Sequence, residues 1–327
     1  MKNCWKELVL AVALAWGMPW VVMAAAEVAF ANEQREQTVN TDPVQTQQES
    51  TGPLDTQPAS SQTISVWTDG KLQEMELSDY LTGVLISEIP GSFHSEAKKA
   101  QAIVARTYAL RRLGGTDKHP GAVCTDSSCC QGYLDPEAFP DAGTVRQARE
   151  AVEATEGMVL TYEGELIDAT YFSSSGGMTE DAVAVWGSDV PYLQSVESPG
   201  EEMAEHYTDT VFYTQERLET ALGISLGGSA ENWIGTVVYT QGGGVASIAI
   251  GGRLFRGTEL RSLLGLRSTS FTVTAEKGGL TFTTKGYGHR VGMSQYGAQA
   301  MALGGSTYGQ ILAHYYQGTA LAQWIDK

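Results

Sequence analysis

Glu88 is the residue whose place in the sequence most suggests acid–base chemistry. It follows Leu81 and Val84 on the apolar face of a helix that is expected to start at Ser78, as its N-cap, and to end before Pro90. Burial disfavours the charged form of a carboxyl group, so we expect the pKa of Glu88 to be raised. A general acid near neutral pH needs such a pKa. The alternative is a partly exposed glutamate at a frayed helix end.

Soft metal donors gather in the segment 119–133, HPGAVCTDSSCCQGY. His119, Cys124, Cys129 and Cys130 are four donors, the number that a tetrahedral zinc site uses. Their spacing is not that of a CxxC pair, and a disulfide from Cys124 to Cys129 or Cys130 is the alternative outside the cytoplasm. The residues leave both alternatives open.

A helix expected at residues 96–113, with Ser95 as its cap, carries side chains that suit a sugar. Arg106 can hold an acid or a hydroxyl, and Tyr108 can stack on a sugar ring. Both can equally be structural, with the arginine stem lying along apolar surface. Arg111 and Arg112 are expected to form a solvated helix end.

Two glycine-containing turns offer further ligand contacts. The run of three serines that begins at Ser173, and Gly176 after it, follows an expected strand at 166–172 and can donate hydrogen bonds to a ligand or form a simple turn. The second turn, at 286–292, contains His289 and leads into a helix with Gln295 near its start. No GK[ST] follows, so this turn is a poor phosphate loop.

Composition and patterning predict a folded α+β domain with mixed helices and antiparallel sheet. The chain has 327 residues, 42% hydrophobic and 18% charged. Its net charge of −17 argues against nucleic acid as a partner. Further helices are expected at 144–155, 215–222, 229–235, 259–264 and 308–316, and strands at 64–67, 158–162, 245–250 and 270–275.

The N-terminal region is expected to direct the folded part out of the cytoplasm. An uncharged run at 8–26 follows Lys2 and Lys6. Residues 1–31 are therefore either a membrane anchor or a cleaved signal segment. Residues 32–62 are rich in Gln, Thr, Glu, Ser and Pro and are expected to form a flexible linker. The folded domain is expected to span 63–327.

Several of these motifs together resemble the stage II sporulation protein D family, the lytic transglycosylases of spore-forming bacteria. The matching segments cover most of residues 77–319 and are specific in combination. They are Tyr80 to Pro90, Ala100 to Tyr108, Cys130 to Tyr133, Tyr171 to Gly177, Gly286 to Ala298 and Ile311 to Thr319.

The resemblance implies a membrane-anchored enzyme that cleaves peptidoglycan glycan strands, with Glu88 at the position of the catalytic acid. Such enzymes act between N-acetylmuramic acid and N-acetylglucosamine, leave a 1,6-anhydro end and prefer strands stripped of stem peptides. The implied partners are the amidase stage II sporulation protein P and the membrane protein M, in engulfment of the forespore from the septum. The residues expected to line the glycan groove are Arg106, Tyr108, Tyr171, Ser173, Ser174, Ser175, Gly176, His289 and Gln295. A related description, that of an amidase enhancer without chemistry of its own, is the alternative.

The chain departs from the family pattern at two positions. Arg290 stands where a glycine is common after the histidine of the glycine-rich turn, which either alters the turn or adds a surface charge. Cys129 stands where some zinc-binding members have a histidine. Cysteine can also bind zinc, and an ion held by His119, Cys124, Cys129 and Cys130 would be structural because no ligand position would stay open.

Overall fold

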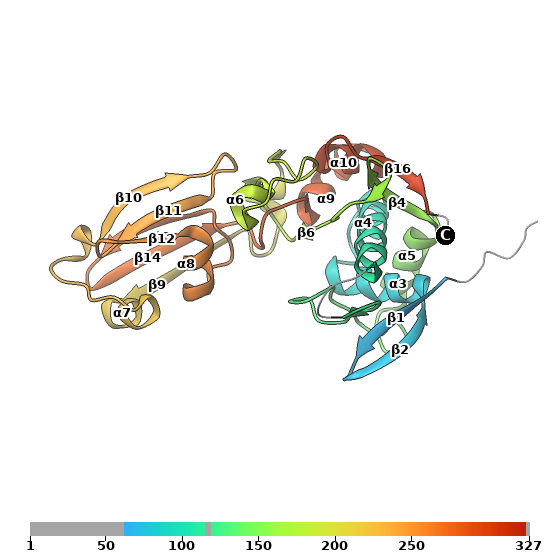
Figure 1. Ribbon diagram of the computed structural model, residues 1–327, viewed down its shortest axis with the longest axis horizontal. Helices are drawn as coiled ribbons and strands as arrows, with labels where there is room; N and C mark the ends of the chain where they lie inside the picture. Colours follow the sequence, from blue (N-terminus) through green and yellow to red (C-terminus); the bar gives the residue numbers. More distant parts are fainter. Residues whose placement is uncertain (1–61, 115–118, 325–327) are drawn as a thin grey trace, which may run out of the picture. The chain divides into compact units, whose positions relative to one another are not determined.

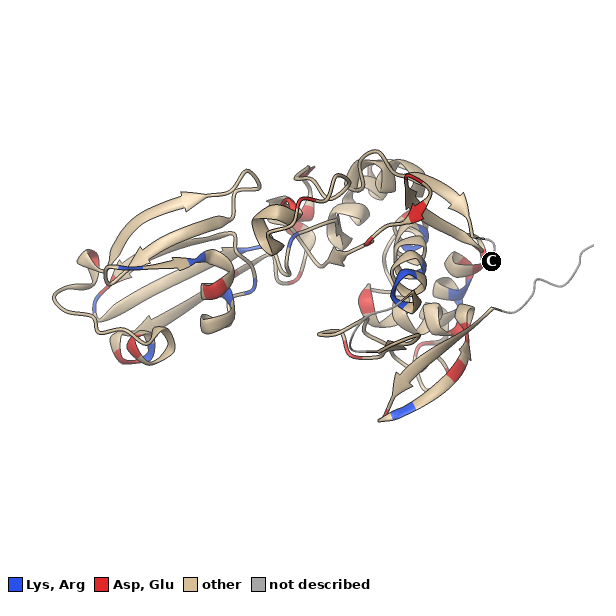
Figure 2. Cartoon of the chain, viewed as in Figure 1, with Lys and Arg blue, Asp and Glu red and all other residues tan. Residues whose placement is uncertain are grey.

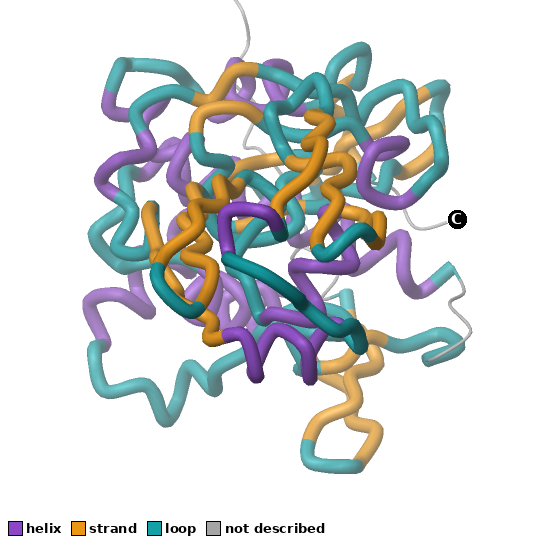
Figure 3. Tube along the Cα trace, turned by 90° about the vertical axis from the view of Figure 1, so that its left-hand side faces the viewer, coloured by secondary structure: helices purple, strands orange, loops and turns teal. Residues whose placement is uncertain are grey.

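The computed structural model describes residues 62–114 and 119–324. They form an α+β fold whose strands are divided among several small sheets between helices and loops (Figure 3). The prediction of mixed helices and antiparallel strands is confirmed in this form. Within the described ranges, no helix is both long and apolar enough to span a membrane. The predicted anchor or signal segment at 1–31, and the linker up to residue 61, lie outside the described residues.

Helix α4 (Ser95–Leu113) lies at the centre of a group of helices (Figure 1). It packs against α3 (Leu77–Glu88), α5 (Ala142–Glu153), α9 (Gln295–Leu303) and α10 (Tyr308–Tyr315). Alanine favours the helical conformation, and its short side chain lets neighbouring helices approach closely. The buried alanines of α4 are Ala97, Ala100, Ala102, Ala105 and Ala109.

Two three-stranded sheets flank these helices. In one, the order is β2–β1–β3, with β1 and β2 antiparallel and β1 and β3 parallel; in the other it is β16–β4–β5, all antiparallel. The predicted alternation of the first strand is present, because Ile64 and Val66 are buried. The bounds are β1 Thr63–Thr68, β2 Lys71–Glu76, β3 Val123–Cys124, β4 Met158–Tyr162, β5 Glu165–Leu166 and β16 Ala320–Gln323.

The strand predicted at 166–172 is divided in the structure. β5 ends at Leu166, and β6 (Tyr171–Phe172) pairs in parallel with β15 (Met293–Ser294). This pairing joins the serine turn to the start of α9, far along the chain. The segment between them contains β7 Gly177–Met178, α6 Ala182–Trp186, β8 Glu197–Ser198 and the 3-10 turn η1 Glu201–Met203.

Residues 208–285 have a hydrophobic core of their own, formed by two antiparallel three-stranded sheets and two short helices. The strand orders are β10–β11–β12 and β13–β14–β9. The predicted helix at 229–235 is only a 3-10 turn, because the chain must be extended from Ile234 to pair with β11. The bounds are β9 Thr208–Thr214, α7 Gln215–Leu222, η2 Ala230–Asn232, β10 Ile234–Tyr239, β11 Val245–Ile250, β12 Arg253–Arg256, α8 Gly257–Leu264, β13 Phe271–Glu276 and β14 Gly279–Lys285.

The predicted N-caps of α3 and α4 were wrong by one or two residues. Helix α3 begins at Leu77, directly after β2, with Glu76 rather than Ser78 at its N-cap. Helix α4 begins at Ser95, and His94 is its N-cap, with Nδ1 accepting a hydrogen bond from the Glu96 N–H at 3.2 Å. The predicted end of α3 before Pro90 is confirmed.

Arg290, the residue that departs from the family pattern, is buried and is not a surface charge. Its side chain links two segments of the fold. It is 1% exposed, and its φ of 69° is the left-handed conformation that glycine adopts readily. Its guanidinium bonds Glu180 Oε1 at 3.0 Å, and Nη2 donates to the carbonyl of Gly242 at 2.7 Å. Glu180 Oε1 also accepts from the Gly244 N–H at 3.0 Å. The pair therefore ties the residues after the serine turn to the turn at 240–244.

We expect Arg290→Met to lower the free energy of unfolding by roughly 3 kcal/mol or more, because it leaves Glu180 buried without its cation. Methionine has the same backbone preference, so the left-handed φ is not relieved. Figure 2 shows acidic and basic residues interspersed along the helices, and one exposed pair on α5 supplies the control. Arg146 is exposed and lies 3.7 Å from Glu150. We expect Arg146→Met to lower the free energy of unfolding by less than about 0.5 kcal/mol. Similar losses for the two variants in urea unfolding would contradict this account.

Candidate active site

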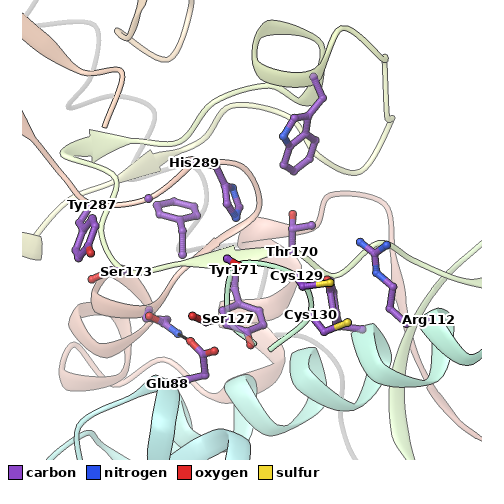
Figure 4. A pocket seen from close by; sticks show the side chains of 16 residues that line it. Glu88, Arg112, Ser127, Cys129, Cys130, Thr170, Tyr171, Ser173, Tyr287 and His289 are labelled. Atoms are coloured by element: carbon purple, nitrogen blue, oxygen red, sulfur yellow. Dashed lines mark hydrogen bonds between the residues drawn. The ribbon is translucent and has the colours of Figure 1, made fainter. Parts of the chain in front are cut away.

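A cleft of about 540 Å³ opens beside the last residue of α3, Glu88. Its walls come from the C-terminal half of α4, residues 127–130 of the segment 119–133 (the cysteine loop), the segment 170–173, α6, and the turn from Tyr287 to Gln295 (Figure 4). Residues from distant parts of the sequence therefore surround one carboxyl group.

Both oxygens of the Glu88 carboxyl group have hydrogen-bond donors. Oε1 accepts from the Gly132 N–H at 2.8 Å, and Oε2 accepts from Nε2 of Gln295 at 3.3 Å. Gly132 has to lack a side chain for this approach, because a Cβ there would lie 3.0 Å from Glu88 Oε1 and 2.6 Å from Ser87 Oγ. The loop and helix α9 thus hold the carboxyl group at the end of α3.

Burial raises the pKa of Glu88 above its ordinary value of 4.5, although the hydrogen bonds from Gly132, Gln295 and Tyr171 act in the opposite direction. The pKa shift predicted from the helical pattern is confirmed in direction. A carboxyl group with a raised pKa that still faces a cleft can deliver a proton to a ligand.

A buried chain of hydrogen bonds supports Tyr171 beside Glu88. Tyr80 Oη donates to Gln131 Oε1 at 3.2 Å, and Gln131 Nε2 donates to Tyr171 Oη at 3.1 Å. Because Tyr171 accepts from Gln131, its own proton is free to point towards Glu88. Burial holds the pKa of Tyr171 well above its ordinary value, so the phenol stays protonated. Gln131 lies within the motif from Cys130 to Tyr133 but was not predicted as a site residue.

Aromatic rings form another wall of the cleft. The His289 ring lies 5.6 Å from that of Phe172 and 5.4 Å from that of Trp186, between centroids. Burial lowers the pKa of His289 to about 4, so the imidazole is neutral at pH 7. Trp186 and Tyr287 are 46% and 42% exposed. Such exposed rings are able to stack on the apolar faces of sugars.

Five of the residues predicted to contact a glycan line the cleft together with Glu88: Tyr108, Tyr171, Ser173, His289 and Gln295. Arg106 does not. Its guanidinium is buried and donates to the carbonyl oxygens of Val152, Thr155 and Met158 at 3.1, 2.7 and 3.2 Å. Arg106 therefore binds the backbone at and beyond the C-terminal end of α5, where carbonyl groups lack helical partners.

Ser174, Ser175 and Gly176 also lie outside the cleft lining. The N–H groups of Ser175 and Gly176 donate to Oε2 of Glu201 at 2.7 and 2.9 Å, and the Ser175 hydroxyl donates to the same oxygen at 2.8 Å. Ser174 exchanges backbone hydrogen bonds with Tyr287. These residues shape the turn that presents Ser173 and Tyr287. The role of Glu201 was not predicted, because its partners are distant in the chain.

Arg112 is a cleft residue that the sequence suggested only as a solvated helix end. It lies in the last turn of α4 and lines the cleft, whereas its neighbour Arg111 forms an ion pair with Asp168 at 2.9 Å. Trp186, which from the sequence could be either a core or a sugar-facing aromatic, lines the cleft. Tyr287 was not predicted as a site residue, because a single aromatic residue in a turn carries no periodic signal.

His119, Cys124, Cys129 and Cys130 form the predicted cluster. Their donor atoms all lie within 4.8 Å of one another, and His119 Nε2 is 3.6 Å from Cys129 Sγ. The three cysteines are free thiols, so the structure does not contain the alternative disulfide among them. One imidazole and three thiols so close together could bind a metal ion.

The raised pKa of Glu88 predicts a pH-dependent effect of Glu88→Gln on stability. Above the folded-state pKa, Glu88 is a charged group in a partly buried place, so its contribution to stability is present at low pH and lost as pH rises. Glutamine keeps an acceptor for the Gly132 N–H without the charge. We expect the variant to be more stable than the wild type at about pH 8 and equal to it below pH 4.5.

Urea unfolding at both pH values measures this difference, with the exposed Glu153→Gln as the control that should show little change at either pH. A Glu88→Gln variant that is less stable at the higher pH would show that the charged carboxyl group is favoured by the fold.

Comparison with known proteins gives a consistent assignment. Residues 68–162, which include Glu88 and the cysteine cluster, match the family model "Stage II sporulation protein". The chain is 37% identical over 262 residues to stage II sporulation protein D of Bacillus subtilis (strain 168), and 38% identical to that of Bacillus amyloliquefaciens. Each alignment covers 77% of this chain and 76% of the relative. An amidase enhancer of Bacillus subtilis (strain 168) is 31% identical, over 75% of this chain and 40% of its own length. The chain belongs to the stage II sporulation protein D family.

Proposed function

We propose that the protein is a peptidoglycan lytic transglycosylase, which cleaves glycan strands between N-acetylmuramic acid and N-acetylglucosamine and leaves 1,6-anhydro ends. The observation that carries this proposal is Glu88 itself: a carboxyl group with a raised pKa, held by two hydrogen bonds at the edge of a cleft with aromatic walls. Sporulation is the setting that the family gives.

Glu88 serves first as the acid. Either carboxyl oxygen can carry the transferable proton, because an O–H oxygen can still accept the hydrogen bond from the Gly132 N–H or from Gln295 Nε2. This proton passes to the glycosidic oxygen as its bond to C1 of the muramyl sugar breaks. The resulting carboxylate then takes the proton of the C6 hydroxyl of the same sugar, and O6 forms the new bond to C1. The carboxyl group ends this step protonated again.

A single carboxyl group is sufficient for this reaction because the nucleophile, the C6 hydroxyl, belongs to the substrate. Two-carboxylate hydrolysis needs a second acid that acts as nucleophile or activates water. Glu88 is the only Asp or Glu among the described residues that line the cleft. The composition of the cleft therefore favours ring closure by the sugar's own hydroxyl.

Recognition of the strand rests on stacking and on neutral hydrogen bonds. Tyr108, Trp186 and Tyr287 offer rings, and Ser173 and Gln295 offer polar groups around Glu88. The roles proposed for Arg106 and for Ser174 to Gly176 are structural, through the contacts described above.

The cysteine cluster is proposed to hold one structural zinc ion. All four donors come from the protein, which completes tetrahedral coordination and leaves no position for substrate. Bound zinc would fix the loop that carries Gly132, and so the Gly132 N–H that faces Glu88. It would take no part in proton transfer.

The proposed place of action is outside the cytoplasm, at the sporulation septum and the engulfing membrane, with the N-terminal segment as anchor or signal. The proposed partners are the amidase stage II sporulation protein P and the membrane protein M. Removal of stem peptides by the amidase would supply the strands that this enzyme cleaves.

We expect Glu88→Gln to abolish the release of 1,6-anhydro fragments while glycan binding is kept, because glutamine cannot give or take the proton. The full chain is incubated with peptide-free glycan strands, and the products are identified by mass spectrometry. The loss should exceed about 100-fold. Glu153→Gln, on an exposed part of α5, should retain full activity. Anhydro products from a purified Glu88→Gln chain would exclude Glu88 as the acid.

The alternative, an amidase-activating protein without chemistry, is favoured by the 31% identity to the amidase enhancer. The same incubation distinguishes the two. New anhydro ends in the absence of an amidase identify an enzyme, whereas stimulation of an amidase without such ends identifies an activator.

We expect about one zinc ion per chain, lost in Cys124→Ser together with more than about 2 kcal/mol of unfolding free energy. Elemental mass spectrometry and urea unfolding measure the two effects. Ser128→Ala, in the same loop but not a donor, should keep the metal. A chain isolated without metal, whose stability is unchanged by added zinc, would contradict a structural zinc site.

A further inference from the structure

The cleft contains one positive charge whose role the proposed reaction does not explain. Arg112, in the last turn of α4, is half-buried and lines the same cleft as Glu88. Its guanidinium carbon lies 4.8 Å from the centroid of the Tyr108 ring. No ion pair joins it to a carboxylate in residues 62–114 and 119–324, whereas Arg111 is paired with Asp168.

Among the described residues, Arg112 is the only Lys or Arg that lines the cleft. The neighbouring imidazole of His289 does not add to it, because its pKa is lowered to about 4 by burial. Figure 4 shows Arg112 and Glu88 on opposite sides of the cysteine loop, with Tyr171 between them. The cleft thus separates a proton donor from a fixed cation.

Structural roles account for only part of this arrangement. A cation in the last turn interacts favourably with the helix dipole, and stacking on Tyr108 orients the guanidinium. Arg112 also forms a side-chain hydrogen bond with Tyr108. A guanidinium has five N–H donors, so a pair of donors remains for a carboxylate. An arginine in a half-buried cleft without an acidic partner is therefore suited to an anionic ligand group.

We propose that Arg112 is a specificity-determining residue that binds the free lactyl carboxylate of a muramyl sugar in the strand. This inference rests on the proposed function for its substrate, a glycan of alternating glucosamine and muramic acid units. The lactyl group carries a negative charge only when no stem peptide is attached, since the peptide converts the carboxylate into a neutral amide. Arg112 thereby distinguishes a stripped strand from an intact one.

Binding of a carboxylate also explains why this residue is an arginine. A guanidinium keeps its charge at any physiological pH and can make two parallel hydrogen bonds to one carboxylate. An amide in the same place could accept at most through its single carbonyl oxygen. We therefore expect the acid form of the strand to be favoured by about tenfold.

The test measures binding rather than cleavage. The protein is the full chain carrying Glu88→Gln, so that the probe is not consumed. The probes are a soluble oligosaccharide of alternating glucosamine and muramic acid with free lactyl carboxylates, and the same oligosaccharide with those groups converted to methylamides. Isothermal titration should show about tenfold tighter binding of the acid probe.

Adding Arg112→Gln should weaken binding of the acid probe by about tenfold and leave the methylamide unchanged, so that the preference disappears. Arg112→Lys should retain part of the preference, because it keeps the charge but not the fork. Arg146→Gln, which removes an exposed cation outside the cleft, should retain all of it. Equal weakening of both probes by Arg112→Gln, or no weakening of either, would overturn the proposal.

Two further measurements separate this inference from structural damage and from the proposed function. Arg112 lines the cleft beside Cys129 and Cys130, so the metal content and melting temperature of each Arg112 variant must match those of its parent. If Arg112→Gln fails this control, the conservative Arg112→Lys is used in its place. A reduced preference for the acid probe then supports the proposal, and an unchanged preference overturns it. Anhydro product release by the wild type is recorded separately. An Arg112-dependent preference without product release supports the inference and refutes the enzyme; product release without the preference does the reverse.

Discussion

The hydrogen bond from the Gly132 N–H to Glu88 Oε1 is the contact on which the site depends. It fixes the carboxyl group at the end of α3. It can form only because the cysteine loop brings a residue without a side chain against Glu88. The segment 119–133, which contains the cluster of His119 and three cysteines, is thus connected to the Glu88 carboxyl group through the backbone amide of Gly132.

A second constraint is the two-residue parallel pairing of β6 with β15. It places Tyr171 and Ser173 beside Gln295, so that segments more than a hundred residues apart form one wall. The buried pair of Arg290 and Glu180 holds the next stretch of both segments. Its position explains why a residue that departs from the family pattern is compatible with the fold: the backbone keeps a glycine-like conformation, and the side chain fills a polar interior position.

Much of the local structure could be predicted from the sequence because it depends on local pattern. Pro90 ends α3, alternation identifies the first strand, and the spacing of apolar residues places Glu88 on a buried face. The errors occur where distant pairing competes with local preference. The predicted helix at 229–235 gives way to β10, and the predicted strand at 166–172 is divided because its second half pairs with β15. The N-caps of α3 and α4 differ from the predicted serines because Glu76 and His94 are the last residues with an extended backbone before each helix.

The sequence by itself identified the family, the candidate acid Glu88 and the cluster of His119 and three cysteines, because each is marked by residue types at short spacing. The tertiary structure decided what surrounds them. It directs Arg106 to the backbone beyond α5 and the serine turn to Glu201, and it brings Arg112 into the cleft. Such assignments depend on which buried donors find acceptors across the fold. A buried guanidinium must satisfy its N–H groups wherever carbonyl oxygens are available, and only the folded chain shows where these lie.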